Sequence, residues 1–365
     1  MKQPWLRFDA DAIEHNARVW RSVLAPRALW PVVKSDAYRL GAVAVARACV
    51  RAGAPCLVIA DIDEAAPLRA AGIGVPLMHV MATADDALAY AVRAGVIPSV
   101  ADSGAARQLA AIAQWKGGAV RAHVAVDTGT GWSGVPAWQA KTFAAEVRKY
   151  PGIDWAGAWT HIASEASMHD QAVAFAGAVD DLRSEGLPVR IVHLASTGPA
   201  VWGAGGDAAR IGIGLFGAAF GDARLTAELR TAVEVRAAVT GIKRFSDQTP
   251  LGYGGLDSAL AGDAIATLRI GYADGMPRIF PSDGVVLIRG VRCGIVGAVG
   301  MNFTMVRLAP EVRDAVAPGD DGIVLGDFDG VRLDAVAKSA TVLPHQLITG
   351  FGTALRREAP VNDRA

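Results

Sequence analysis

Side chains that could do chemistry stand at the ends of short apolar runs in the first two thirds of the chain. Lys34 ends the first run, His161 closes the sixth, and Arg210 lies on the eighth. A lysine held beside a buried strand can lose its charge through desolvation, and a neutral lysine condenses with an aldehyde to form an imine. This is the chemistry that pyridoxal phosphate needs, so the pattern predicts a site for that cofactor.

Hydroxyl groups and glycines close to Arg210 are candidates for holding a phosphate. Ser196 and Thr197 follow the seventh apolar run, and residues 212–214 read Gly-Ile-Gly. Backbone N–H groups and hydroxyls are the donors that a phosphate group requires. The glycine pattern alone is a weak signal, and it gains meaning from its position beside the lysine and the arginine.

The elements that must position these groups are predicted from the spacing of the runs. Alanine-rich amphipathic stretches separate them, and this alternation predicts an α/β fold with a parallel (β/α)8 TIM-type barrel, in which the ends of all strands meet at one mouth. After about residue 222, β-rich runs punctuated by glycine predict a mostly β C-terminal domain. We expect residues 1–222 to form the barrel, although the first few could join the β domain, and residues 223–365 to form the β domain. The eight runs are 29–33, 56–60, 76–80, 97–100, 120–126, 155–162, 189–194 and 210–214.

Composition excludes several classes of protein. The chain has 365 residues, 52% of them hydrophobic, with 36 basic and 36 acidic side chains, so it lacks the excess charge that attracts nucleic acid or anionic lipid. The three cysteines form no CxxC pair, and no apolar stretch near the N-terminus or later suits a signal or a membrane span. The seven histidines include no HExxH motif. We therefore expect a cytoplasmic protein without a metal site, a nucleic-acid partner or a membrane partner.

Several longer motifs resemble one enzyme family. Residues 31–41, Pro-Val-Val-Lys-Ser-Asp-Ala-Tyr-Arg-Leu-Gly, resemble the pyridoxal-phosphate signature of alanine racemases, which are fold type III enzymes. The sequence is identified as a divergent member of this family because the likeness runs through nearly the whole chain. It continues at residues 127–129, 160–161, 193–197, 210–217, 252–255, 271–278 and 296–302.

The resemblance implies a role for each matching residue of the barrel. Lys34 would carry the cofactor and act as the base on one face of the substrate. Arg210 would face the pyridine nitrogen, and because an arginine keeps its proton, the cofactor would be a restrained electron sink. A cofactor that withdraws electrons less strongly favours proton transfer over side reactions. The other cofactor-binding residues would be Tyr38, Ser196, Thr197, Gly212 and Ile213.

Racemisation needs a second base on the opposite face of the substrate. In the resembled family this base is a tyrosine of the neighbouring subunit, and Tyr253 matches it. His161 and Arg210 match the groups that orient that tyrosine, while Tyr272 and Met301 fall in motifs that border the substrate. The resemblance thus implies a head-to-tail homodimer acting on a small amino acid.

The chain departs from the family pattern around the substrate. Trp132 stands where the family usually has an arginine that holds the substrate carboxylate, and Ala125 stands where many members have a lysine that orients this arginine. Gly352 takes the place of a tyrosine that narrows the substrate corridor. These changes predict a remodelled pocket for an amino acid larger than alanine, with Trp132 as a pocket wall or as plain loop packing.

Two other functions remain open at this point. A decarboxylase or eliminase using pyridoxal phosphate could dispense with the carboxylate clamp, but decarboxylation profits from a protonated ring nitrogen, which Arg210 disfavours. A non-catalytic carrier of pyridoxal phosphate would not need the β domain or Tyr253. We therefore favour the racemase.

Overall fold

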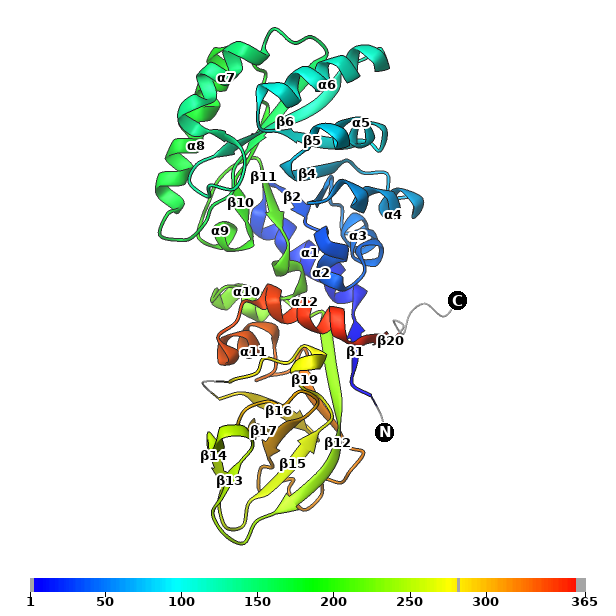
Figure 1. The fold of residues 1–365 in the computed structure, drawn as a ribbon, viewed down its shortest axis with the longest axis vertical. Coiled ribbons are helices and arrows are strands. Elements are labelled where there is room, and N and C mark those ends of the chain that lie inside the picture. The colour runs from blue at the N-terminus through cyan, green and yellow to red at the C-terminus, as the bar shows by residue number, and fades with distance from the viewer. Residues whose placement is uncertain (1–2, 281–282, 359–365) are drawn as a thin grey trace.

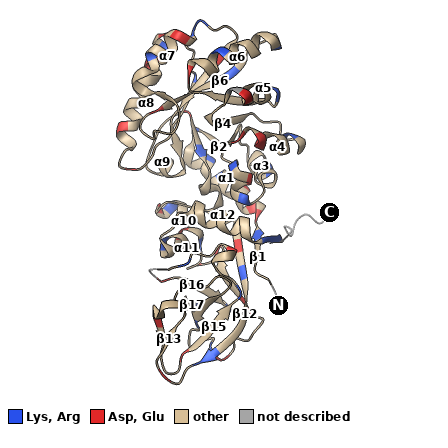
Figure 2. Cartoon of the chain, viewed as in Figure 1, with Lys and Arg blue, Asp and Glu red and all other residues tan. Residues whose placement is uncertain are grey.

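The computed structural model describes residues 3–280 and 283–358, so the outermost residues of both predicted domains lie outside it. The molecule is elongated, with a barrel at one end, a β domain at the other, and helix α12 (Pro344–Ala354) between them (Figure 1). Basic and acidic side chains are interspersed over both parts (Figure 2). The predicted fold class is confirmed, and the division after residue 222 remains our proposal.

The barrel is made of parallel strands that match the eight apolar runs. Each strand pairs with the next, β10 pairs with β11 and β11 with β2, and a bridge between Val32 and Val58 joins β2 to β3 and closes the ring. The small strand β7 (Val135–Pro136) pairs with β6 outside this ring. The barrel strands are β2 (Ala28–Pro31), β3 (Leu57–Ile59), β4 (Leu77–Ala82), β5 (Val96–Val100), β6 (Val120–Asp127), β8 (Ile153–Trp159), β9 (Ile191–His193) with β10 (Ala195–Ser196), and β11 (Ala208–Ile211).

Amphipathic helices cover the outside of the barrel. Helix α1 is typical, because the Asp9 side chain accepts the backbone N–H groups of Asp11 and Ala12 at 2.9 Å and so caps its first turn. Its apolar face buries Trp20 completely. The helices are α1 (Ala10–Leu24), α3 (Ala42–Arg51), α4 (Ala65–Ala70), α5 (Asp85–Arg93), α6 (Ser103–Lys116), α7 (Ala140–Val147), α8 (Met168–Ser184) and α9 (Thr197–Val201), and the short helix α10 (Ala223–Glu228) follows β11 beyond residue 222.

The β domain is a mostly antiparallel sheet that curls on itself. Its order is β15-β18-β17-β16-β19-β12-β1-β20, and β15 pairs again with β12. Strand β1 comes from the N-terminus and pairs with β12 and β20, so the first strand of the chain belongs to this sheet. Helices α11 (Leu333–Ala340) and α12 lie in the chain between β19 and β20. Its strands are β1 (Trp5–Phe8), β12 (Val233–Arg244), β15 (Ala264–Leu268), β16 (Val285–Ile288), β17 (Val291–Ile295), β18 (Thr304–Arg307), β19 (Asp321–Leu325) and β20 (Arg356–Glu358), with the hairpin β13 (Thr249–Leu251) and β14 (Asp257–Ala259) beside them.

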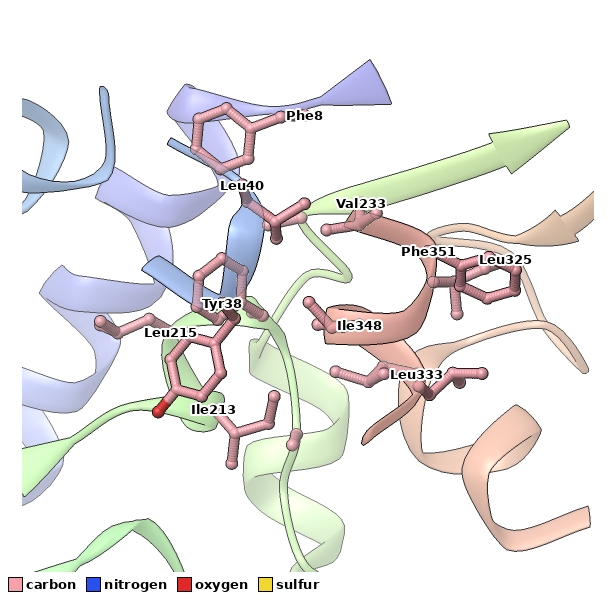
Figure 3. Close-up of a cluster of buried hydrophobic side chains, with 14 of the residues drawn as sticks. Phe8, Tyr38, Leu40, Ile213, Leu215, Val233, Leu325, Leu333, Ile348 and Phe351 are labelled. Atoms are coloured by element: carbon pink, nitrogen blue, oxygen red, sulfur yellow. The ribbon is translucent and has the colours of Figure 1, made fainter. Parts of the chain in front are cut away.

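One continuous apolar core joins the two parts of the chain. Ile348 and Phe351 of α12 are fully buried and belong to the same cluster as Tyr38 and Leu215 of the barrel (Figure 3). Because apolar burial contributes about 25 cal/mol per Å², such a shared core holds the two domains as one folded unit. Helix α12 is therefore placed firmly against the mouth of the barrel.

Candidate active site

Lys34 is presented by an unusual turn at the end of β2. It begins α2 (Lys34–Arg39), in which residues 35–39 all have positive φ angles although none is glycine. A left-handed conformation costs an ordinary residue about 1–2 kcal/mol, so the turn must be held by its surroundings. Glu64 accepts the N–H of Ser35, and Asp36 accepts the N–H of Ala42 at 2.7 Å. This strained turn carries both Lys34 and Tyr38.

The surroundings of Lys34 favour its neutral form. Burial lowers the pKa of the half-buried ammonium, the charge of Glu64 opposes this effect, and the charge of Arg210 adds to it. A lysine with a lowered pKa is neutral in a larger fraction of molecules and is therefore a better nucleophile and base.

Arg210 is buried and donates three hydrogen bonds to neighbouring residues. Its Nη1 donates to the carbonyl oxygen of His193 at 2.6 Å and to Nδ1 of the same residue at 2.8 Å, while its Nη2 donates to the carbonyl oxygen of Thr160 at 2.7 Å. Burial lowers the pKa of Arg210 to about 9, so the group remains cationic at neutral pH. Since an arginine can only donate, Nδ1 of His193 must be unprotonated. His193 in turn shares a 2.9 Å hydrogen bond with His123.

His161 and Trp132 lie together at the cavity wall. Their ring centroids are 5.1 Å apart, and the indole is 56% exposed. Burial lowers the pKa of His161 to about 4, helped by the charges of Arg210 and Lys34, so the imidazole is neutral at physiological pH. Asp127 accepts the N–H groups of Gly129 and Thr130 at 2.9 and 3.0 Å and orders the loop that leads to Trp132.

Donor groups converge around Gly212. The Thr197 hydroxyl accepts the N–H groups of Gly212 and Gly214 at 3.2 and 3.3 Å. A Cβ atom on Gly212 would lie 2.1 Å from the hydroxyl oxygen of Tyr38, so only glycine fits there. Tyr38 is fixed by an edge-on contact with Phe216, with 5.3 Å between the ring centroids. This end of the site is a small, polar and tightly built recess.

The structure brings one further titratable group to this recess, which sequence reasoning missed. His345, at the start of α12, lies with its ring centroid 5.8 Å from that of Tyr38, and its buried Nδ1 has no hydrogen-bond partner. Burial lowers the pKa of His345 to about 4, and the charge of Lys34 adds to this shift. The corridor position of Gly352 stays a prediction; a Cβ on this residue would lie 2.9 Å from the carbonyl oxygen of Arg39 and 3.1 Å from that of Tyr38. The signal in the sequence was a histidine directly after Pro344.

A cavity of about 320 Å³ at the barrel mouth collects the predicted barrel residues. Among the described residues of its wall, His345 alone comes from beyond residue 222. The volume lies in the usual range for a site that binds a small molecule. The predicted residues that line it are Lys34, Tyr38, Trp132, His161, Ser196, Thr197, Arg210, Gly212 and Ile213.

The three predicted residues of the β domain are not brought to this cavity. Tyr253, Tyr272 and Met301 are exposed by 64%, 42% and 55%. They lie in neighbouring loops, because the N–H of Tyr272 bonds to the carbonyl of Gly300 at 3.0 Å and Tyr253 follows β13 beside Phe303. Figure 1 shows β13 at the end of the β domain that points away from the barrel.

Residues 3–280 and 283–358 lack the features of two other kinds of site. No group of three or more His, Cys, Asp or Glu side chains is arranged to hold a metal ion there. None of the helices in these ranges is long and apolar enough to cross a membrane.

Comparison with known proteins gives consistent matches along the chain. The family models "Alanine racemase, N-terminal domain" and "Alanine racemase, C-terminal domain" match residues 8–219 and 232–359. Alanine racemase of Desulfovibrio desulfuricans is 30% identical over 362 residues, which cover 97% of each chain. Alanine racemase 2 of Caldanaerobacter subterraneus subsp. tengcongensis is 32% identical and covers 96% of this chain and 93% of its own length.

Solved structures show the same relationship. Alanine racemase from a D-cycloserine-producing Streptomyces lavendulae superposes with a TM-score of 0.86 at 27% identity, covering 98% of this chain and 97% of its own. Alanine racemase from Bartonella henselae, described with covalently bound pyridoxal phosphate, has a TM-score of 0.82 at 25% identity and covers 98% of this chain and 99% of its own. Both domains are matched in sequence and in structure, and the chain belongs to the alanine racemase family.

Proposed function

We propose that this protein is a pyridoxal-phosphate-dependent amino-acid racemase that interconverts L- and D-amino acids. The observation that carries the proposal is Lys34, a lysine with a lowered pKa at the wall of the cavity at the barrel mouth, where Arg210 also lies. The relatives are named alanine racemases, and one of their structures is described with the cofactor bound covalently. We place the reaction in the cytoplasm because the three cysteines are buried and unpaired.

The chemistry of the donor groups fits the cofactor. A phosphate would find the hydroxyls of Tyr38 and Thr197 and the backbone at Gly212 at one end of the cavity. His345 lines the same cavity, and its unpartnered Nδ1 needs a polar partner, because a buried nitrogen without one costs about 1–3 kcal/mol. When bound, pyridoxal phosphate would supply an electron sink that makes the α-proton of an amino acid acidic.

The barrel residues then have distinct tasks. Lys34 would hold the cofactor, and its Nζ would take or return the α-proton of the substrate. Arg210 would place a positive charge near the cofactor ring without readily giving up a proton, and this would restrain the electron sink. Neutral His161 sits between the cavity and its exterior, where it can orient an incoming phenol.

The second base is proposed to come from another copy of the chain. Tyr253, Tyr272 and Met301 form an exposed group that the chain's own cavity does not use. In a head-to-tail homodimer, each group would close the partner's cavity, and Tyr253 would face Lys34 across the substrate. Acid and base on opposite faces are what racemisation requires.

We further propose that the preferred substrate is an amino acid larger than alanine. Trp132 borders the cavity at the position where the family usually has an arginine, and the indole offers an apolar surface for a side chain. Burying that surface contributes about 25 cal/mol per Å², which can replace part of a lost charge contact.

Proton exchange tests the proposed reaction directly. The protein loaded with pyridoxal phosphate is incubated in deuterium oxide with alanine, serine, lysine, leucine and phenylalanine, and NMR with chiral chromatography follows the α-position. Exchange together with inversion supports a racemase. Release of carbon dioxide or ammonia without inversion would instead support a decarboxylase or eliminase, and no turnover of any kind would favour a cofactor carrier.

Borohydride reduction tests the assignment of the lysine. Reduction should fix the cofactor to a single residue, and peptide mapping should find it at Lys34. Label on any other lysine contradicts the arrangement of the site given above.

A further inference from the structure

An aromatic side chain lies directly under the buried charge of the site. Trp159, the last residue of β8, is 2% exposed, and the Cζ atom of Arg210 is 5.4 Å from the centroid of its ring. This distance is within the range of a cation–π contact, which is stronger where water is excluded. Trp159 also lines the cavity, so it lies at the cavity floor beside the arginine.

The indole is locked in place from its other side. Its Nε1 donates to the hydroxyl of Ser99 at 2.8 Å, and that hydroxyl donates in turn to the carbonyl of His79. Ser99 is completely buried. A side chain held by such a chain of hydrogen bonds has one orientation, and the ring therefore presents a fixed face to Arg210.

The buried positive charge of Arg210 has no anionic hydrogen-bond partner among the contacts of the structure, so a cation–π contact with Trp159 would stabilise it. Its hydrogen-bond acceptors are two carbonyl oxygens and the neutral imidazole of His193, none of which is anionic. The described titratable groups whose charges interact with Arg210 are cationic or neutral, so none supplies a compensating negative charge; they are Lys34, His161, His193 and His123. The face of an aromatic ring is electron-rich and stabilises a cation without offering it a proton acceptor.

The neighbouring strand makes room for the ring. Ala125 of β6 is the register partner of Trp159, and both belong to the apolar cluster inside the barrel. A long side chain at position 125 would compete with the indole for the same space. The small residue at 125 and the large one at 159 are therefore complementary.

We propose that Trp159 is a positioning residue whose indole face holds the Arg210 guanidinium charged and in place at the cofactor ring. The proposal rests on the proposed function for the role of Arg210. It adds a residue to that function, because no step of the reaction assigned above uses Trp159.

The experiment compares four variants of the full-length protein loaded with pyridoxal phosphate. Trp159→Leu removes the ring, and Trp159→Phe retains a smaller ring without the N–H group. Ser99→Ala retains the indole but removes the hydroxyl to which its Nε1 donates. Trp155→Leu is the matched control, because Trp155 is a buried tryptophan on the same strand that packs against Phe143 in a different cluster. Visible absorbance of the bound cofactor is followed from pH 6 to 10, and kcat and KM are measured for the best substrate.

Trp159→Leu is expected to shift the alkaline change in the absorbance spectrum of the bound cofactor by about half to one pH unit, because the guanidinium charge that acts on the cofactor is no longer held in place. We expect kcat to fall about tenfold while KM changes less than about threefold, since the arginine acts on the reacting system rather than on substrate binding. Trp159→Phe and Ser99→Ala should show the same shift in smaller size, and Trp155→Leu should show none.

Equal alkaline transitions in Trp159→Leu and wild type, or an equal shift in Trp155→Leu, would overturn the proposal. If Trp159→Leu does not fold, Trp159→Phe and Ser99→Ala provide the test. The proposal is contradicted if neither of these two variants shifts the alkaline transition. The absorbance titration needs no turnover, so it tests Trp159 even where the panel of amino acids shows no racemisation and the proposed function fails.

Discussion

The mouth of the barrel and the loops around Tyr253 differ in how much of their surroundings one chain supplies. At the mouth, Arg210 is 3% exposed and donates three hydrogen bonds within its own chain, whereas Tyr253 is 64% exposed. A buried polar group that is hydrogen-bonded to its neighbours has a fixed orientation, whereas an exposed tyrosine side chain can adopt several rotamers. The difference is what our proposal requires, in which a single chain supplies the cofactor site and one side of the substrate site, and a second chain supplies the other side.

The largest expected effect tests whether a second chain completes the site. Lys34→Ala and Tyr253→Phe should each lower racemisation by at least about a thousandfold, because each removes one of two bases. When the two inactive proteins exchange subunits, half of the sites in each hybrid dimer contain both intact residues. Activity should then return to about a quarter of wild type, as expected for random pairing in a symmetric dimer.

The control for this experiment is proof of exchange. Differently tagged subunits should co-purify after mixing, and native mass spectrometry should find the hybrid. No recovery of activity despite a demonstrated hybrid would place both bases in one chain and remove the contrast between the two regions.

The second expected effect concerns the mouth of the barrel, at the recess around Gly212. Gly212→Ala places a Cβ where the hydroxyl of Tyr38 now lies, at 2.1 Å, and should weaken binding of pyridoxal phosphate about a hundredfold by closing the recess. Equilibrium dialysis with absorbance detection measures the dissociation constant. Gly205→Ala is the matched control, because a Cβ there meets nothing within 4 Å. Unchanged affinity in Gly212→Ala would show that the phosphate is held elsewhere.

The third expected effect concerns Trp132 at the wall of the cavity, where the proposed substrate site would be completed by the loops around the partner's Tyr253. Trp132→Arg should raise kcat/KM for alanine about tenfold, because a charge-assisted hydrogen bond to the substrate carboxylate is worth about 1.5–3 kcal/mol, of which only part is gained without the lysine at position 125. The wild type should handle a bulkier amino acid at least about tenfold better than alanine. If alanine is the best substrate of the wild type, Trp132 is only loop packing.

Much of this arrangement could be predicted from the sequence, since strand spacing and motif order are local patterns. The barrel, the β domain and the gathering of Lys34, Arg210 and Thr197 at one mouth all follow from alternation of apolar runs. The left-handed turn after Lys34 could not be predicted, because residues 35–39 contain no glycine to signal positive φ and are held by distant groups such as Glu64. The position of His345 at the cavity could not be predicted either, because it depends on the packing of α12 against the barrel.

His345 gives the smallest expected effect and the sharpest test of the boundary between the two regions. Burial lowers its pKa from 6.5 to about 4, so below about pH 6.5 the unfolded chain binds a proton that the folded chain does not. The free energy of unfolding therefore falls as the pH falls through this window, by at most about 1.4 kcal/mol per pH unit for one group. Urea unfolding of cofactor-free protein at pH 7 and pH 5.5 measures this loss.

His345→Gln should lose about 1 kcal/mol less between these two pH values than the wild type, allowing for partial exposure of the ring. The exposed His169→Gln serves as the control and should behave as the wild type does. Bound phosphate would supply the unpartnered Nδ1 with an anion and raise the pKa of His345, so loading the wild type with pyridoxal phosphate should reduce its acid loss, and loading His345→Gln should reduce it less. If the variant and the wild type lose stability equally with and without the cofactor, α12 does not reach the phosphate, and the β domain serves only the partner's cavity.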